Sequence, residues 1–174
     1  MPFGEQWLLA AREIVGEHLL AAPEDLQAYA HDEYATAEFN RLPAALVRPG
    51  STAEVARIVR RCAREGVPLT ARGGGTGLAA ACVPCEGGVV LSLERLARVV
   101  EADPANRTIT AQAGLTLGRL YEEVEALGLY FPPHPGDEGA TRVWVAPAGG
   151  SRARVTWVMT ASVPSEPSIS SNRP

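Results

Sequence analysis

A run of glycines follows directly on a short apolar segment. Residues 72–77 read Arg-Gly-Gly-Gly-Thr-Gly, and Val67–Thr70 before them has the composition of a strand. Glycine lacks a Cβ, so its backbone can adopt positive φ and successive N–H groups can converge into an anion-binding concavity. Thr76 adds a hydroxyl donor, and Arg72 brings a positive charge nearby. The loop fits a pyrophosphate, while a flexible surface turn is the alternative that the loop alone leaves open.

Two common phosphate-binding patterns do not match this loop. A Walker loop is excluded because no Gly-Lys-Ser/Thr follows and the chain contains no lysine. Residues 75–80 match the relaxed pattern G-x-G-x-x-G/A, but that fingerprint needs a helix that opens at the loop. Pro84 and Gly87–Gly88 interrupt the residues before the next predicted strand at Val89. We therefore do not expect an NAD site of the Rossmann type.

Other residue types that could carry chemistry are scattered. Cys82-Val-Pro-Cys85 has the spacing of a redox pair or half a zinc site. A redox pair needs a helix N-terminus to lower one thiol pKa, and zinc needs two more ligands. Neither is evident, so we interpret both cysteines as small residues that close the glycine-rich loop. The candidates for acid–base chemistry are His31, His134, Asp137 and Glu138, and no Ser/His/Asp constellation can be assigned.

The elements that must position these residues come from periodicity and from helix ends. Apolar residues recur at helical spacing over 7–19, and a polar, irregular stretch follows over 23–43. Ala45–Val47 is a strand candidate. The next predicted helix begins at a capping box, in which Ser51 and Glu54 satisfy each other's backbone donors, and ends at Gly66.

The second half of the chain predicts a hairpin and a further helix. Residues 89–93 form a strand candidate, and two more at 99–102 and 108–112 flank the turn signal Asp-Pro-Ala-Asn. Leu117–Leu127 has helical spacing, with Thr116 as its cap and Gly128 as its end. These elements alternate over one domain length, and no internal repeat is visible.

Composition narrows the class of protein. The chain has 174 residues, a net charge of −4 and 46% apolar residues, which suits one domain with a single core. All cations are arginine, and no basic patch argues for nucleic acid. Three cysteines cannot pair completely, and no run approaches the roughly 18 apolar residues that span a bilayer. We therefore expect a cytoplasmic protein without a secretion signal or transmembrane segment.

A series of short motifs in fixed order carries a family resemblance over about residues 30–141. They include 42–49 (Leu-Pro-Ala-Ala-Leu-Val-Arg-Pro), the glycine loop 72–77, 86–93 (Glu-Gly-Gly-Val-Val-Leu-Ser-Leu), 113–118 and 132–139 (Pro-Pro-His-Pro-Gly-Asp-Glu-Gly). The chain resembles the FAD-binding domain of vanillyl-alcohol-oxidase/PCMH-type flavoproteins. Within them it is most similar to the FAD-linked 2-hydroxy-acid dehydrogenases of the glycolate oxidase and D-lactate dehydrogenase group.

The resemblance implies an α+β fold of two small α/β lobes with FAD between them. It implies three segments: an N-terminal helix over 1–29, the FAD-binding domain over 30–151 and an irregular tail over 152–174. The residues it assigns to FAD are Ala71, Arg72, Gly73, Gly74, Gly75, Thr76 and Gly77 in the first segment, and Pro135, Gly136, Asp137, Glu138, Gly139, Ala140 and Thr141 in the second. Members that tether FAD covalently often carry a histidine in the first loop; here Gly75–Thr76 occupies that place, which implies non-covalent FAD.

The chain departs from the family pattern after Thr141. The family usually continues there with Ile-Gly-Gly-Asn, whereas this chain has Arg-Val-Trp-Val at residues 142–145. Arg152–Pro174 resembles nothing in the family, which implies an incomplete second lobe and an N-terminal fragment produced by a frame change or deletion. In the intact enzyme a hydride would pass from the 2-hydroxy acid to the flavin. Other subunits of an oxidase complex are implied partners, and no catalytic or metal-binding residue is assigned. The alternatives are a non-enzymatic nucleotide-binding or partner protein, an inactive fragment, and a redox or zinc protein built on Cys82 and Cys85.

Overall fold

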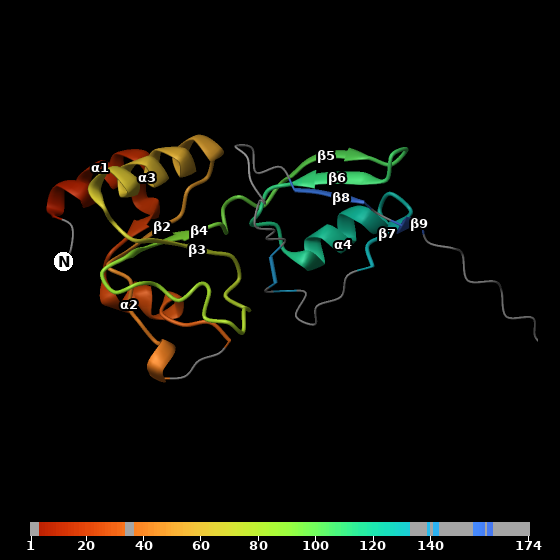
Figure 1. Ribbon diagram of the computed structural model, residues 1–174. Coiled ribbons are helices and arrows are strands. Elements are labelled where there is room, and N and C mark those ends of the chain that lie inside the picture. Colours follow the sequence, from red (N-terminus) through yellow and green to blue (C-terminus); the bar gives the residue numbers. More distant parts are fainter. Residues whose placement is uncertain are drawn as a thin grey trace, which may run out of the picture.

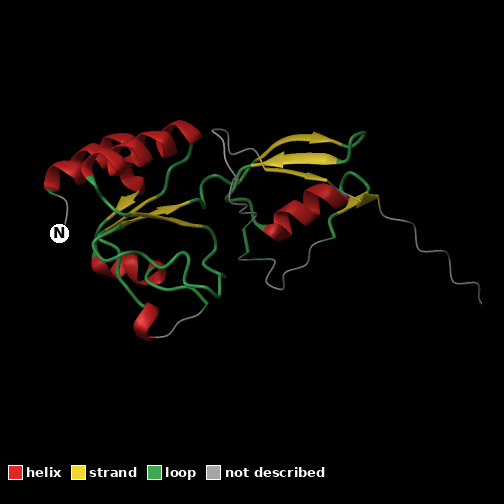
Figure 2. Ribbon diagram, in the orientation of Figure 1, coloured by secondary structure: helices red, strands yellow, loops and turns green. Residues whose placement is uncertain are grey.

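The structure is a computed structural model that describes residues 4–33, 37–132, 139, 141–142, 155–158 and 160–161. Helices and strands alternate in two lobes that lie side by side (Figures 1 and 2). The predicted α+β class is confirmed. No helix in the described ranges is long and apolar enough to cross a bilayer.

The first lobe is a four-stranded sheet with helices on both faces. Its strands follow the spatial order β1-β2-β4-β3, and all pairs are parallel except β1 with β2. In chain order its elements are α1 (Glu5–Val15), η1 (Gly16–His18), β1 (Leu19–Leu20), α2 (Pro23–Leu26), η2 (Gln27–Tyr29), η3 (Ala37–Phe39), β2 (Ala45–Val47), α3 (Thr52–Glu65), β3 (Leu69–Arg72) and β4 (Val89–Ser92).

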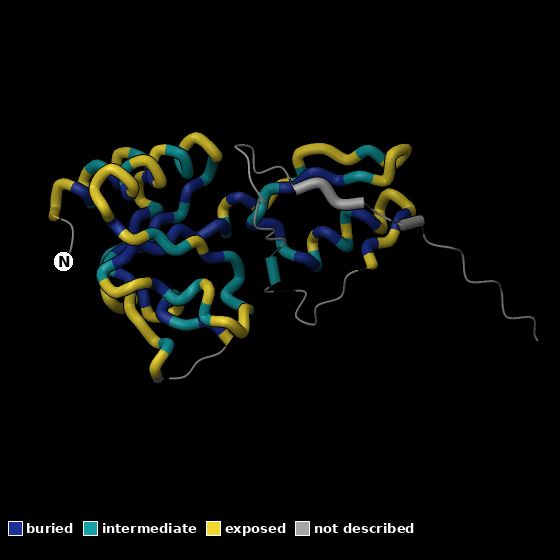
Figure 3. The backbone as a smooth tube through the Cα atoms, in the orientation of Figure 1, coloured by how far each residue is buried: buried dark blue, intermediate teal, exposed yellow. Residues whose placement is uncertain are grey.

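The central strands β2 and β4 are apolar except for Ser92, and both faces of the sheet are covered. Val47 and Val89 point into the core beneath α1 and α3, where Trp7 and Ile58 are fully buried. The residues that alternate with them along the strands, Leu46 in β2 and Val90 in β4, point to the opposite face and pack against the α2–η2 segment. Figure 3 shows this buried layer running through the middle of the lobe. Strands buried on both faces lose the polar alternation of half-exposed strands.

Helix α3 has the boundaries that the sequence predicts, with one difference at its start. Ser51 Oγ accepts a hydrogen bond from the Glu54 N–H at 3.2 Å. The Glu54 carboxylate does not reciprocate at the Ser51 N–H; it accepts from the N–H of Gly50 at 2.9 Å and from the Ser51 hydroxyl at 3.1 Å. Gly66 ends the helix at φ +66°. The capping box therefore differs in one hydrogen bond: the Glu54 carboxylate accepts from the N–H of Gly50, one residue before the expected donor.

The first predicted helix ends earlier than the apolar periodicity over residues 7–19 predicts. Helix α1 ends at Val15 because Gly16 takes φ +62° and turns the chain. Leu19, expected on the helix, lies in β1 opposite Val47. The stretch predicted to be irregular over 23–43 contains the short helices α2, η2 and η3.

The second lobe places one helix against a small antiparallel sheet. Its elements are β5 (Val99–Asp103), β6 (Thr108–Ala111), α4 (Leu117–Glu125), β7 (Leu129–Tyr130), β8 (Val155–Val158) and β9 (Thr160–Ala161). The predicted hairpin is confirmed as β5 and β6, and Thr116 caps α4 by accepting from the Arg119 N–H at 3.3 Å. Leu120 and Val124 of α4 pack with Ile109 in a core separate from that of the first lobe.

Two strands correct the expectation of an irregular segment over 152–174. Strand β8 pairs antiparallel with β6, and β9 pairs with β7. The β-branched and aromatic run Val-Thr-Trp-Val at 155–158 explains the strand, since such residues pack well on a pleated surface. The Ser- and Pro-rich composition that predicted irregularity belongs to the residues after 161, which lie outside the described ranges.

The two lobes meet where the main chain passes itself at Gly114. Its N–H donates to the Leu96 carbonyl at 2.8 Å. A Cβ built on Gly114 would lie 2.7 Å from the carbonyl carbon of Leu93 and 2.8 Å from the Leu96 oxygen. Only glycine permits this close approach. Gly114 therefore holds the second lobe against the segment that follows β4.

Candidate functional site

The glycine loop lines a cavity between the two lobes. The chain leaves β3 on the side of the first sheet that faces the second lobe (Figure 1). The cavity has a volume of about 240 Å³. Its lining residues are Ala71, Gly73, Gly74, Gly75, Thr76, Gly77, Ala81, Cys82 and Arg142. The structure therefore brings six of the seven predicted residues of the first segment to one cavity, and the seventh, Arg72, does not line it.

The conformation at Gly75 orients the loop's main chain. Gly75 has φ +81°, and its carbonyl accepts a hydrogen bond from the Glu33 N–H at 3.1 Å. A trans peptide is planar, so the N–H of Thr76 points opposite to the Gly75 carbonyl. That N–H is thereby directed away from the segment at residue 33, and Thr76 is one of the residues that line the cavity. The loop can offer main-chain N–H groups to an anion, as its composition predicts.

Arg72 lies beneath the loop instead of beside the cavity. It is the last residue of β3, and only 7% of it is exposed. Its Nη1 donates to the His31 carbonyl at 2.6 Å, and its Nη2 donates to the Ala28 carbonyl at 3.1 Å. Its guanidinium carbon lies 5.6 Å from the centre of the Tyr29 ring. The predicted charge is present, but its hydrogen bonds are directed into the first lobe.

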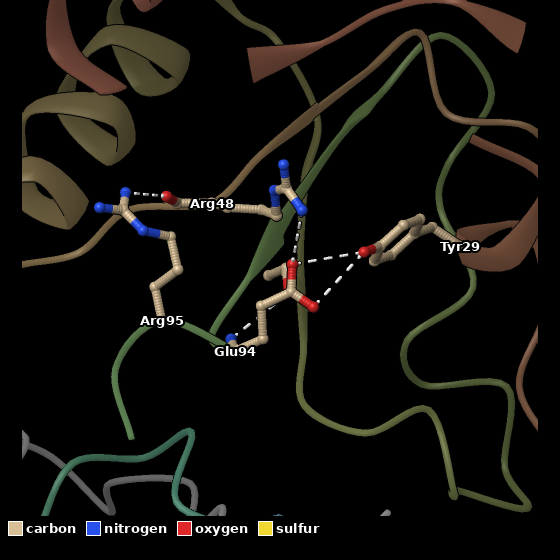
Figure 4. A network of polar contacts seen from close by, with 5 residues as sticks. Tyr29, Arg48, Glu94 and Arg95 are labelled. Carbon is tan, nitrogen blue, oxygen red and sulfur yellow. Dashed lines mark hydrogen bonds and ion pairs between the residues drawn. The ribbon is translucent and has the colours of Figure 1, made fainter. Parts of the chain in front are cut away.

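Tyr29 joins this arginine to a polar network at the ends of β2 and β4 (Figure 4). The Tyr29 hydroxyl donates to the Glu94 carboxylate at 3.3 and 3.4 Å, and Arg48 pairs with the same carboxylate at 3.5 Å. Burial, and next the charge of Glu94, raise the pKa of the Tyr29 hydroxyl. The hydroxyl therefore stays protonated as a donor, which fixes the ring on which Arg72 rests.

Thr141 and Arg142 approach the loop from the second lobe. The Thr141 hydroxyl donates to the Thr76 hydroxyl at 3.4 Å, and the Thr141 carbonyl accepts from the Leu117 N–H at 2.8 Å. Arg142 forms a β-bridge with Thr116 and donates from Nη1 to the Gly114 carbonyl at 2.6 Å. Its Nε is buried and has no hydrogen-bond partner within the described residues. Arg142 thus brings a positive charge to the wall of the cavity.

The remaining predicted residues of the second segment are less fully defined. Gly139 lies in an exposed turn. Pro135, Gly136, Asp137, Glu138 and Ala140, and the acid–base candidate His134, lie outside the described residues. Ala81, Cys82 and Arg142 line the cavity although the sequence did not assign them to it. The spacing of Cys82 drew attention to redox and zinc chemistry, and no local signal marked Arg142.

Comparison with known proteins identifies the family. A family model described as an FAD binding domain matches residues 43–158, more than half of the chain. The chain belongs to the FAD-binding domain family. FAD is the family's cofactor, as the sequence predicts.

Relatives of this FAD-binding domain are oxidoreductases of several names. The chain is 40% identical over 129 residues to an uncharacterized FAD-linked oxidoreductase of Mycobacterium tuberculosis, covering 72% of this chain and 27% of the relative. It is 42% identical over 110 residues to a D-lactate dehydrogenase of Archaeoglobus fulgidus (62% and 25%) and 36% identical over 107 residues to glycolate oxidase subunit GlcD of Bacillus subtilis (62% and 22%). The chain spans about a quarter of the length of these relatives.

Solved structures agree with the fold. An alkyldihydroxyacetonephosphate synthase superposes with a TM-score of 0.72 at 17% identity, over 81% of this chain and 30% of the other. A 4-ethylphenol oxidase from Gulosibacter chungangensis superposes with a TM-score of 0.66 at 26% identity, over 79% and 28%. The predicted PCMH-type arrangement of two small lobes is confirmed.

The two cysteines of the Cys82-Val-Pro-Cys85 motif occupy different surroundings. Cys82 lines the cavity, where its Sγ lies 3.4 Å from Arg72 Nη1, and Cys85 is exposed. Burial raises the pKa of the Cys82 thiol, and Arg72 opposes that shift in part. Neither cysteine lies on a helix, and the described residues contain no group of three His, Cys, Asp or Glu side chains placed to hold a metal. Cys82 is therefore a neutral thiol in the cavity wall.

The donor set of the cavity suits an anionic, phosphate-bearing group. Glycine main chain forms one wall, with hydroxyl donors at Thr76 and Thr141. A Cβ on Gly73 would lie 3.5 Å from the Cβ of Arg142, so the glycine leaves room beside the guanidinium-bearing residue. The unpartnered Nε–H of Arg142 is a further donor. These groups fit the pyrophosphate of FAD.

Proposed function

We propose that this chain forms the pyrophosphate-binding part of the FAD site in a flavin-dependent oxidoreductase that oxidises a 2-hydroxy acid of the glycolate or D-lactate type. The observation that carries the proposal is the cavity walled by Gly73–Gly77, with Arg142 facing the glycines. Main-chain N–H groups at glycines can approach a pyrophosphate closely because no side chain intervenes.

The residues proposed to hold FAD are those that the resemblance assigns. In the first segment, residues 71 and 73–77 contact the cofactor, and Arg72 contributes from below. In the second segment, residues 135–141 contribute main-chain N–H groups and the Thr141 hydroxyl, which already lies 3.4 Å from Thr76. We propose non-covalent binding, supported by the absence of histidine from the described residues that line the cavity.

The substrate class rests on the relatives' names. D-lactate dehydrogenases, glycolate oxidase subunits and D-2-hydroxyglutarate dehydrogenases share a 2-hydroxy acid in those names. Bound FAD supplies the hydride acceptor, and this chain's residues bind and orient its pyrophosphate. No residue of this chain is proposed to touch the substrate. Further subunits are proposed partners, because one relative is named as an oxidase subunit. We also propose a cytoplasmic location, supported by the three cysteines, which cannot all pair in disulfides.

Titration of the purified full chain with FAD tests the proposal. We expect saturable quenching of flavin fluorescence, competition by ADP, which shares the pyrophosphate, and no comparable competition by riboflavin, which lacks it. Bound FAD should also slow alkylation of Cys82 by iodoacetamide while leaving the exposed Cys85 unaffected, as an internal control. Failure to bind FAD or ADP refutes the proposal. Binding of ADP with no preference for FAD would favour a non-enzymatic nucleotide-binding protein.

A further inference from the structure

The guanidinium of Arg72 is held in place from three sides, all within the first lobe. The carbonyls of Ala28 and His31 accept from its two terminal nitrogens at 3.1 and 2.6 Å. The Tyr29 ring lies 5.6 Å away, and Cys82 Sγ lies 3.4 Å from Nη1. A planar fork with several donors can satisfy partners in fixed directions at once, which an ammonium on a flexible chain does less well.

Gly75 rests directly on this guanidinium. A Cβ built on Gly75 would collide with Nη2, and it would lie 2.7 Å from Cζ and 3.3 Å from Nε. The same residue has φ +81°, and the Glu33 N–H holds its carbonyl. The position of the Arg72 guanidinium therefore limits where the Gly75–Thr76 peptide can lie, and both residues of this peptide line the cavity.

The glycine loop has no regular secondary structure of its own, and its described hydrogen bonds come from Glu33 and Thr141. Residues 73–77 lie outside any helix or strand, so no regular hydrogen-bond ladder fixes the peptide planes there. Asp32 is also buried nearby, and a Cβ on Gly77 would lie 3.7 Å from its Oδ2. The ion pairs among the described residues do not include Arg72, whose contacts are carbonyl oxygens, sulfur and an aromatic face.

We propose that Arg72 is the positioning residue of the glycine cradle: it acts on a bound pyrophosphate through the Gly75–Thr76 main chain and not by contact. This inference rests on the proposed function of the cavity. Arg72 orders the segment 28–31 and the glycine loop against one another, and its buried charge lies under the main chain that meets the anion. Tyr29 is the platform of this arrangement and is itself fixed by Glu94.

Binding of three probes to full-length Arg72→Gln and Arg72→Lys chains tests the inference. The probes are ADP, inorganic pyrophosphate and adenosine, measured at a temperature where each variant remains folded by circular dichroism. Loss of hydrogen bonds to a charged group predicts about ten- to hundredfold weaker binding of ADP and pyrophosphate to Arg72→Gln, with adenosine unchanged. Arg72→Lys keeps the charge but not the fork, so we expect an intermediate loss.

Arg61→Gln is the matched control. Arg61 also donates to a main-chain carbonyl, that of Gln6 at 3.5 Å, and its side chain is 19% exposed, but it lies on α3. We expect wild-type binding of all three probes. If Arg72→Gln has an unfolded circular dichroism spectrum, the lysine variant carries the test, and its unaltered affinity for pyrophosphate would overturn the inference.

The outcomes separate the inference from the proposed function. A wild-type chain that binds neither ADP nor pyrophosphate refutes the function of the cavity itself. A wild-type chain that binds both, together with Arg72 variants that bind equally well, overturns only the role of Arg72. Equal loss of ADP, pyrophosphate and adenosine would show a general structural role and also overturn it.

Discussion

Substitution of Gly75 by alanine tests the packing on which the cradle depends. Two effects add at this position. A non-glycine residue in the left-handed region costs about 1–2 kcal/mol. The new methyl group also meets the Arg72 guanidinium, 2.7 Å from Cζ, and displaces it from the carbonyls of Ala28 and His31. One lost hydrogen bond to a buried charged group costs about 1.5–3 kcal/mol. We therefore expect Gly75→Ala to lower the free energy of unfolding by about 3–5 kcal/mol.

Gly128→Ala is the control for the backbone effect alone. Gly128 has φ +69°, close to the value at Gly75, and a Cβ there has no atom within 4 Å. We expect a loss of about 1–2 kcal/mol, reduced somewhat by the smaller entropy of the unfolded chain. The difference between the two variants isolates the collision with Arg72.

Urea denaturation of wild type and both variants measures this difference. Thermal unfolding gives a second measure of the same difference. A gap of about 2–3 kcal/mol corresponds to thermal midpoints roughly 4–12 °C apart for a chain of this size. Equal destabilisation by the two alanines would refute the reasoning, because it would show that the guanidinium moves aside without cost. Retained ADP binding in a folded Gly75→Ala chain would separately contradict the predicted role of the loop.

Three further predictions follow from the contacts elsewhere in the fold. Gly114→Ala should destabilise the chain by about 3 kcal/mol or more, or prevent folding, because its Cβ would lie 2.7 Å from the main chain of Leu93; thermal unfolding measures this. Burial raises the pKa of Cys62 from 9.0 to about 11, so the contribution of this thiol to stability should be fully present below pH 9 and fall by about 2–3 kcal/mol as pH rises to 11, since only the unfolded thiol ionises there. In urea titrations at each pH, a Cys62→Ala chain should lose less stability over this range than wild type and keep only the part due to other buried groups such as Cys82. Tyr29→Phe removes the hydroxyl bonds to Glu94 and should cost about 0.5–1.5 kcal/mol in the same assay, and no measurable loss would show that the network in Figure 4 does not stabilise the fold.

Elements with local signals were predictable from the sequence. Ser51 and Gly66 mark the two ends of α3, and both act through hydrogen bonds or dihedral angles within a few residues. The turn at 103–106 predicts the β5–β6 hairpin for the same reason, since Asp103 accepts from the Asn106 N–H at 3.1 Å. A capping or turn residue needs no knowledge of the rest of the fold.

Positions decided by distant partners were not predictable in this way. Leu19 has helical periodicity with α1, yet pairing with Val47 places it in a strand. Arg72 reads as a charge beside a phosphate loop, but carbonyls more than forty residues earlier in the chain turn it inward. Arg142 reaches the cavity because the second lobe folds back onto Gly114. Each outcome depends on a contact between segments far apart in sequence, which periodicity and spacing do not report.

The connection between β3 and β4 explains why two arginines converge on this loop. The strands are parallel, and residues 73–88 join them without a helix. In a Rossmann unit the helix that follows the glycine loop supplies aligned N–H groups and the positive end of its dipole to the phosphates. That source of positive potential is missing from residues 73–88, so the loop's own peptides need another fixed support and another positive charge. The structure places the guanidinium of Arg72 under Gly75 and the aliphatic part of the Arg142 side chain beside Gly73. If the proposed function holds, the glycine cradle and the two arginines together replace the helix N-terminus of a Rossmann unit, and removal of Arg72 should affect both the geometry and the charge of the site.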